Sequence, residues 1–179
     1  MRDLLMILRL SDDSHDTYGV ERMASLTLLT HSSVAVNKLM RLGSSLAPRS
    51  RARALEAFRR AREIDPLYAE APNRIAHLLY LDGNYEQAVS HAKIAIALCP
   101  DLISAIGLLG MSLDKLNRLP EARSAFRRGL ELHPWSHDLS SKLFAAERRV
   151  EQQGQQCGGT AAVADGTGEG GHKTLQEKQ

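Results

Sequence analysis

Apolar residues in the middle of the chain recur three or four positions apart, which is the spacing of one face of an amphipathic helix. A first stripe of this kind consists of Ile75, Ala76, Leu78 and Leu79. A second stripe consists of Tyr85, Ala88, Ala92, Ala95 and Leu98. Asp82-Gly83-Asn84 separates the two with residues that favour turns, and Pro100 ends the second because proline lacks an amide donor. The pattern predicts two antiparallel helices joined by a tight turn.

The same arrangement returns after 34 residues, the interval that separates Pro66, Pro100 and Pro134. Small and apolar residues keep step with the prolines: Ala54, Ala88 and Ala122, then Ala61, Ala95 and Gly129, then Ile64, Leu98 and Leu132. In the second clear unit the first helix contains Leu109, Gly110 and Leu113, the turn contains Asn117, and the second helix contains Ala122, Phe126, Gly129 and Leu132. A repeat of this kind predicts a stack of helix pairs, each burying its apolar face against its neighbours.

Individual positions within the period follow a known consensus. They are the mid-helix pair Leu109-Gly110, the turn residue Gly83, and the second-helix residues Tyr85, Ala88, Phe126, Ala95 and Pro100. In these features the sequence resembles the tetratricopeptide repeat (TPR), a helix–turn–helix unit. The tryptophan that the consensus places early in the first helix is absent, and Pro72 and Ile106 stand there. The resemblance implies an all-α solenoid of three to four antiparallel helix pairs that binds a partner.

We expect three repeats, at residues 35–68, 69–102 and 103–136. The first is less regular than the others. Its second helix fits well, through Ala54, Phe58, Ala61, Ile64 and Pro66. Its first helix, with Leu39, Leu42, Gly43 and Leu46, stands about one residue out of register. Ser50 and Arg51 replace the glycine and the aromatic residue that the connection would otherwise contain.

The two ends of the chain are predicted to differ from the repeats. Residues 1–34 form an N-terminal helical segment, and a degenerate fourth repeat is the alternative interpretation. Residues 137–150 continue the apolar pattern and then turn polar, as a capping helix does. Residues 151–179 hold seven of the thirteen glycines and almost no large apolar residue, so we expect a disordered tail there.

Composition limits the function classes only weakly. The formal net charge of +2 is too small to indicate a polyanionic partner by itself. Cys99 and Cys157 are the only cysteines, which is typical of a reducing, cytoplasmic setting. No apolar run is long enough to span a membrane. The alternative is a mitochondrial location, because residues 22–55 contain no acid and would resemble a transit peptide if translation began at Met23.

The resemblance implies a concave surface lined by the first helix of each repeat. Carried over by position, the groove residues are Asn73, Arg74, His77, Tyr80, Leu108, Met111, Lys115 and Lys142, with Ser104, Gly107, Asp138 and Ser141 beside them. We expect Leu108 and Met111 to be exposed. This mixture of amide, cation and soft apolar surface suits an extended or helical peptide of some acidic character. An ordinary solvated helix face is the alternative.

One binding mode of the family can be compared directly with this sequence. Co-chaperone members hold the C-terminal carboxylates of chaperones with lysine, asparagine and arginine at five positions. The residues at those positions here are Leu39, Gly43, Arg74, Ser104 and Leu108. Only Arg74 is a cation, and it stands where asparagine is required. We therefore do not expect a carboxylate clamp.

A second candidate surface is a stripe of cations at the repeat interval, formed by Arg59, Lys93 and Arg127 with Arg60 and Arg128 beside them. The stripe lies away from the apolar faces, on the convex side. Its functional interpretation is a nucleic-acid-associated repeat, and the favoured interpretation is a solvated face, because no aromatic platform accompanies it.

Catalytic and metal-binding patterns are weak. His133 and His137 stand four apart, but Pro134 separates them and no third ligand follows at a suitable spacing. We expect no enzyme activity, no cofactor and no metal in this chain. The predicted function is that of an adaptor or scaffold that binds another protein or peptide, and a regulatory fragment of a larger enzyme is a further alternative.

Overall fold

The computed structural model describes residues 33–159 of the chain, with side chains described for residues 33–153. This part consists of helices and turns, without a strand. The helices are α3 (Val34–Leu46), α4 (Arg51–Ile64), α5 (Glu70–Leu81), α6 (Tyr85–Leu98), α7 (Ile103–Lys115), α8 (Leu119–Leu132) and α9 (His137–Gly159). The predicted segment 1–34 and its interpretation as a fourth repeat lie almost entirely outside the described residues.

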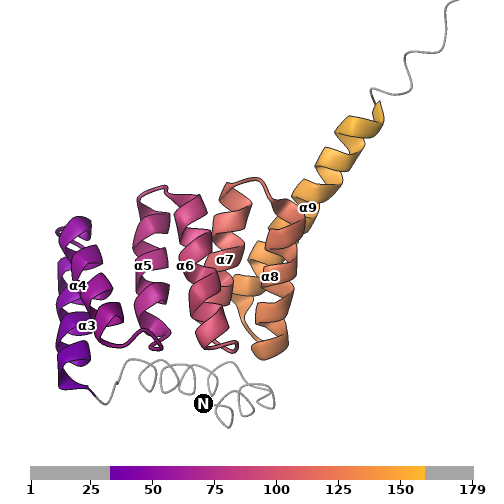
Figure 1. Cartoon of the computed structure of the whole chain (residues 1–179). Helices are drawn as coiled ribbons and strands as arrows, with labels where there is room; N and C mark the ends of the chain where they lie inside the picture. Colours follow the sequence, from indigo (N-terminus) through magenta and orange to yellow (C-terminus); the bar gives the residue numbers. More distant parts are fainter. Residues whose placement is uncertain (1–32, 160–179) are drawn as a thin grey trace, which may run out of the picture.

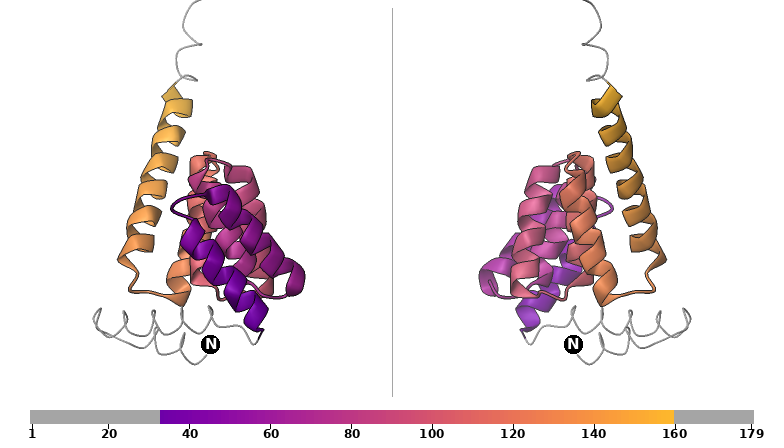
Figure 2. Two further views of the ribbon diagram at one scale, coloured as in Figure 1. Left: turned by 90° about the vertical axis from the view of Figure 1, so that its left-hand side faces the viewer. Right: turned by 90° about the vertical axis from the view of Figure 1, so that its right-hand side faces the viewer.

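The helices stand side by side in chain order and form a solenoid (Figure 1). The pairs α3–α4, α5–α6 and α7–α8 correspond to the three predicted repeats. Each pair packs against the next, and α5 also contacts α7 across the stack. Figure 2 shows the stack from both ends, with α9 beside α8 and running out beyond it. The predicted all-α solenoid is confirmed over the described residues.

Two turns between paired helices depend on a left-handed residue. Gly83 has a φ of 78° and Asn117 a φ of 59°. They stand 34 positions apart, at the same point of successive repeats. Glycine adopts this backbone conformation without steric cost, and asparagine tolerates it better than most residues. The turn chemistry read from the sequence at both positions is therefore confirmed.

The core of the outer two repeats contains a phenylalanine ring pressed against a glycine of the preceding helix. Phe58 and Phe126 are both 2% exposed. A Cβ atom built on Gly110 would lie 2.5 Å from Cε1 of Phe126, and one built on Gly43 would meet the ring of Phe58 equally closely. In the middle repeat, two fully buried alanines, Ala76 and Ala92, share one cluster instead. Small residues thus let paired helices approach closely.

The irregular register of the first repeat has a simple structural cause. Gly43 precedes the first residue of α4 by eight positions, whereas Gly110 precedes the first residue of α8 by nine. The span from the glycine to the second helix is therefore one residue shorter in the first repeat, although its connection, residues 47–50, is one residue longer than residues 116–118 of the third. No residue of that connection has a positive φ, so the left-handed turn of the later repeats is absent there. Even so, Gly43 lies against the ring of Phe58, just as Gly110 lies against the ring of Phe126 in the third repeat.

The C-terminal helix is longer than predicted. The sequence predicts a capping helix over 137–150 and disorder from Glu151, but α9 continues to Gly159. Arg149 forms an ion pair with Asp114, and the Gln153 side-chain amide donates to Asn117 Oδ1 at 3.0 Å. These contacts hold α9 against the turn of the third repeat, and the glutamines beyond it are compatible with helix. The correction concerns residues 151–159, because the remainder of the predicted tail lies outside the described residues.

Replacing Gly110 with alanine is expected to destabilise the fold by about 1–3 kcal/mol, because the ring of Phe126 has no room to move away. Gly107→Ala is the matched control on the same helix. A Cβ atom there meets only Leu139 Cδ2, at an ordinary 3.4 Å, so the higher helix propensity of alanine should stabilise the chain by up to about 1 kcal/mol. Urea unfolding of both variants measures the difference, and equal effects would contradict this packing.

Candidate peptide-binding groove

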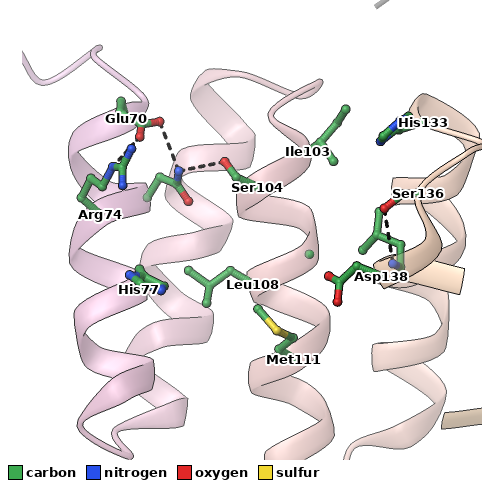
Figure 3. A pocket seen from close by; sticks show the side chains of 13 residues that line it. Glu70, Arg74, His77, Ile103, Ser104, Leu108, Met111, His133, Ser136 and Asp138 are labelled. Carbon is green, nitrogen blue, oxygen red and sulfur yellow. Dashed lines mark hydrogen bonds and ion pairs between the residues drawn. The ribbon is translucent and has the colours of Figure 1, made fainter. Parts of the chain in front are cut away.

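An open groove crosses the first helices of successive repeats, with a cavity volume of about 400 Å³. Its walls come from α5, from α7 and from the segment that leads into α9 (Figure 3). It contains five of the predicted residues, Asn73, Arg74, His77, Leu108 and Met111. It also contains Ser104, Gly107 and Asp138, which the sequence placed on the same surface, together with Glu70, Ile103, His133, Ser136 and Leu139.

A network of polar side chains lies along one wall of the groove and is centred on Glu70, which is only 4% exposed. Arg74 Nε donates to Glu70 Oε1 at 2.7 Å, and Asn73 Nδ2 donates to Glu70 Oε2 at 3.1 Å. Asn73 Nδ2 also donates to Ser104 Oγ at 2.9 Å, which joins α5 to α7 (Figure 3). Both oxygens of this buried carboxylate are therefore compensated. Asn73 and Arg74 hold the groove wall together as well as facing the groove.

The apolar part of the groove comes from α7. Leu108 is 3% exposed and packs with Ala76 and Ala92, so the expectation that it is exposed is wrong. The stripe of α7 is wide enough to bury Leu108 between neighbouring repeats while one edge of the residue still lines the groove. Met111, one turn further on, is half-buried and extends the apolar surface towards solvent (Figure 3). Methionine adapts its shape to varied apolar side chains.

His77 has the most perturbed electrostatic setting among the predicted groove residues. Its side chain is exposed at the surface, but the walls of the groove remove part of its hydration. This desolvation, with the positive charge of Arg74 as the second cause, lowers the pKa of His77 below its ordinary value of 6.5. A neutral imidazole offers one donor and one acceptor. His77 therefore suits hydrogen bonding to a neutral polar group at neutral pH.

Three predicted groove residues do not line the cavity. Tyr80 is half-buried and packs against Tyr85 in a tilted arrangement, with ring centroids 5.5 Å apart. Lys142 forms an ion pair with Asp138 one turn away on α9. Lys115 is exposed in the last turn of α7. They stand one or more turns along the same helices, so the helical position was read correctly but the extent of the groove was not.

Three polar groove residues were missed by the sequence reading: Glu70, His133 and Ser136. Glu70 had a detectable signal, because it stands four positions before Arg74, at the spacing of an ion pair on a helix. The sequence signal at His133 was weaker. His133 occupies the same repeat position as Cys99, but nothing in the sequence shows that the start of α9 would form a groove wall beside it. His133 is 4% exposed. Within residues 33–159 no three metal-ligating side chains gather at one place.

Comparisons with known proteins agree with this architecture. A curated relative, a STIP1 homologue of Dictyostelium discoideum, is 38% identical over 98 residues, which cover 52% of this chain and 17% of that protein. The first TPR domain of Spaghetti (RPAP3), solved with the HSP90 peptide SRMEEVD, aligns with a TM-score of 0.65 at 21% identity, over 67% of this chain and 96% of that domain. The Sgt2 TPR domain of Aspergillus fumigatus aligns with a TM-score of 0.65 at 18% identity, over 80% and 92%.

The chain folds as a tetratricopeptide-repeat array. No family profile matches the sequence. The array spans about 17% of the length of the curated relative that it matches. Among the described residues of the array, no helix is both long enough and apolar enough to cross a bilayer.

The histidines make the stability of the TPR array dependent on pH. His91 resembles His77 in that burial, followed by the charges of Arg62 and Arg59, lowers its pKa. The unfolded chain therefore takes up protons more readily than the folded chain, and stability should fall as pH drops below about 6.5.

NMR titration of the imidazole resonances should place the pKa of His77 below 6.5 in the folded array and near 6.5 in urea. Arg74→Gln should raise the pKa of His77, whereas Arg74→Lys should leave it nearly unchanged because the charge is kept. Equal titration in the folded and unfolded chains would contradict the desolvation of this side chain.

Proposed function

We propose that this TPR array is a non-catalytic interaction module that holds a peptide segment of another protein in the groove between α5, α7 and α9. The observation that carries the proposal is the groove itself, which pairs a half-buried apolar residue, Met111, with a wall of fixed hydrogen-bonding side chains. Such a surface can take an apolar side chain and orient the polar backbone around it.

The fixed wall favours binding, because the groups that contact a ligand are already ordered before it arrives. Asn73, Ser104 and Arg74 are held by Glu70 and by each other. A preorganised site loses little side-chain entropy on binding. The same network gives Ser104 a structural role, since its Oγ accepts a hydrogen bond from the Asn73 amide and joins α5 to α7.

A carboxylate clamp of the kind implied for co-chaperones is not part of this proposal. Arg74 is already engaged with a buried carboxylate. Gly43 lies against Phe58, and Leu108 is buried in the core, so neither position could supply a cation. Asp138 adds negative charge to the same groove. The groove therefore favours an apolar peptide with neutral polar groups over a peptide that ends in several acids. The acidic character expected of the partner from the sequence is not part of this proposal.

Peptides selected from a random display library against the full chain should bind through the groove. The combined variant His77→Ala with Met111→Ala removes exposed and half-buried contacts without touching the Glu70 network. This double variant should bind such a peptide about tenfold more weakly or worse, as measured by fluorescence anisotropy. The matched control is Gln87→Ala with Ser124→Ala, two exposed residues of α6 and α8, and it should leave the affinity unchanged.

A second arm of the same experiment uses the peptide SRMEEVD, which is bound in the structure of the Spaghetti TPR domain. We expect at least about tenfold weaker binding of this peptide than of the selected ones. Tight binding of SRMEEVD, lost in Arg74→Gln, would show that the groove takes terminal carboxylates after all. Selected peptides that bind the double groove variant as well as the original chain would remove the groove from the proposal.

A further inference from the structure

The convex side of the array contains clefts where the second helices of successive repeats diverge. One cleft lies between α4 and α6 and is lined by Arg59, Arg62, Glu63, Pro66 and His91, with a volume of about 440 Å³. The next lies 34 positions further along, where Lys93 stands in place of Arg59 and Ile96 in place of Arg62. The two clefts are therefore the same structural position in successive repeats.

Their chemistry differs sharply. In the second cleft, Ile96 and Ala125 replace Arg62 and His91. Apolar side chains form much of its lining, beside the charged residues Lys93, Glu121 and Arg128. In the first cleft, two guanidinium groups and an imidazole converge from two different repeats. The first cleft thus brings two arginines and a histidine together without large aliphatic side chains, a grouping that the even stripe of cations read from the sequence did not indicate.

The arginines of the first cleft differ in their ion pairs from two nearby or equivalent arginines of the convex side. Arg127, the equivalent of Arg59 in the third repeat, donates to Glu147 of α9 at 2.7 Å. Arg60, next to Arg59 in sequence, pairs with Glu56 at 3.1 Å. Among the described residues neither Arg59 nor Arg62 forms an ion pair with a carboxylate, although Glu63 lines the same cleft.

His91 adds a third observation. Its Nδ1 atom is buried and has no hydrogen-bond partner among the described residues. The positive charges of Arg62 and Arg59 act on this imidazole and lower its pKa, after the larger effect of burial. The two arginines disfavour the protonated form of His91, and an anion bound between them would offset this effect.

We propose that the cleft between α4 and α6 is a binding site for a phosphoryl oxyanion, recognised by Arg59, Arg62 and His91. Guanidinium groups match the geometry of phosphate oxygens in a two-pronged contact. The two arginines and Glu63 together carry a net charge near +1, and His91 can take up a proton when a dianion arrives. A phosphoryl dianion is therefore favoured over a single carboxylate. This site is separate from the peptide groove and does not depend on the proposed function.

The test is a titration of the full chain with inorganic phosphate at pH 7.5, followed through the imidazole resonances of His91 and compared with sodium chloride at equal ionic strength. We expect a saturable shift with phosphate and no saturable shift with chloride. Arg62→Gln, which changes the half-buried arginine, should lower the affinity for phosphate by about tenfold. Arg59→Gln should lower this affinity by a smaller factor. Glu63→Gln should tighten it, because a like charge is removed from the cleft.

The matched control is Arg60→Gln, which makes the same charge change one residue away from the cleft and should leave the affinity within about twofold. Loss of binding in this variant as large as in Arg62→Gln would show general charge screening and overturn the site. A phosphate shift no larger than that of chloride would overturn it as well. Unfolding of a variant could only lower its affinity for phosphate. Because Glu63→Gln is expected to raise that affinity, unfolding cannot produce the predicted pattern.

Two further probes distinguish the source of the phosphoryl group. Tighter binding of the tripeptide Ala-phosphoserine-Ala than of inorganic phosphate would assign the cleft to a phosphorylated protein segment, and the reverse order would assign it to a free phosphate. Sodium acetate is the carboxylate probe, and acetate binding as tight as that of phosphate would contradict the preference for a phosphoryl group.

Discussion

The close approach of paired helices is the constraint on which the rest of this array depends. Where a phenylalanine fills the space between two helices, the facing residue is a glycine, as at Gly43 and Gly110. Where the core contains alanines on both helices, as at Ala76 and Ala92, both side chains are small enough and no glycine is needed. The sum of the side-chain volumes, rather than the identity of one residue, sets the distance between helices. Because each repeat packs directly on the next, the distance within each helix pair also determines where α5, α7 and α9 stand relative to one another. The side chains of these helices line the groove.

The two faces of the array follow different rules because they are built from different helices. First helices approach one another across the stack, as the contact between α5 and α7 shows, and their side chains interlock into the network around Glu70. Second helices diverge, so each pair leaves a cleft whose character depends on a few positions. Where the first cleft has Arg62 and His91, the next has Ile96 and Ala125, and its surface is correspondingly more apolar. A repeat protein can therefore change chemistry at one place without disturbing the stack.

Much of the fold was predictable because the stacking constraint leaves a periodic trace in the sequence. The prolines, the turn residues Gly83 and Asn117, and the small residues facing phenylalanine all recur because the geometry recurs. The groove was predictable only in part. Helical position placed Asn73, Arg74 and His77 on the face where the cavity lies. It could not show that Leu108 is buried, because Ala76 and Ala92, which pack against Leu108, belong to the preceding repeat. Nor could it show the length of α9, which depends on contacts of Arg149 and Gln153 with a turn that is distant in sequence.

These contacts of α9 bear on how the array comes apart. A solenoid whose units touch only their neighbours tends to fray from its ends, and a terminal helix is the first element to be released. Here α9 is fastened at two separate levels, by Leu139 packed beneath Gly129 and by Arg149 and Gln153 at the turn that contains Asn117. Because α9 packs along α8 while its side chains reach back to α7 and to the turn after it, its release must disturb both helices of the third repeat. We therefore expect the C-terminal end of the array to open as a unit of three helices rather than one helix at a time.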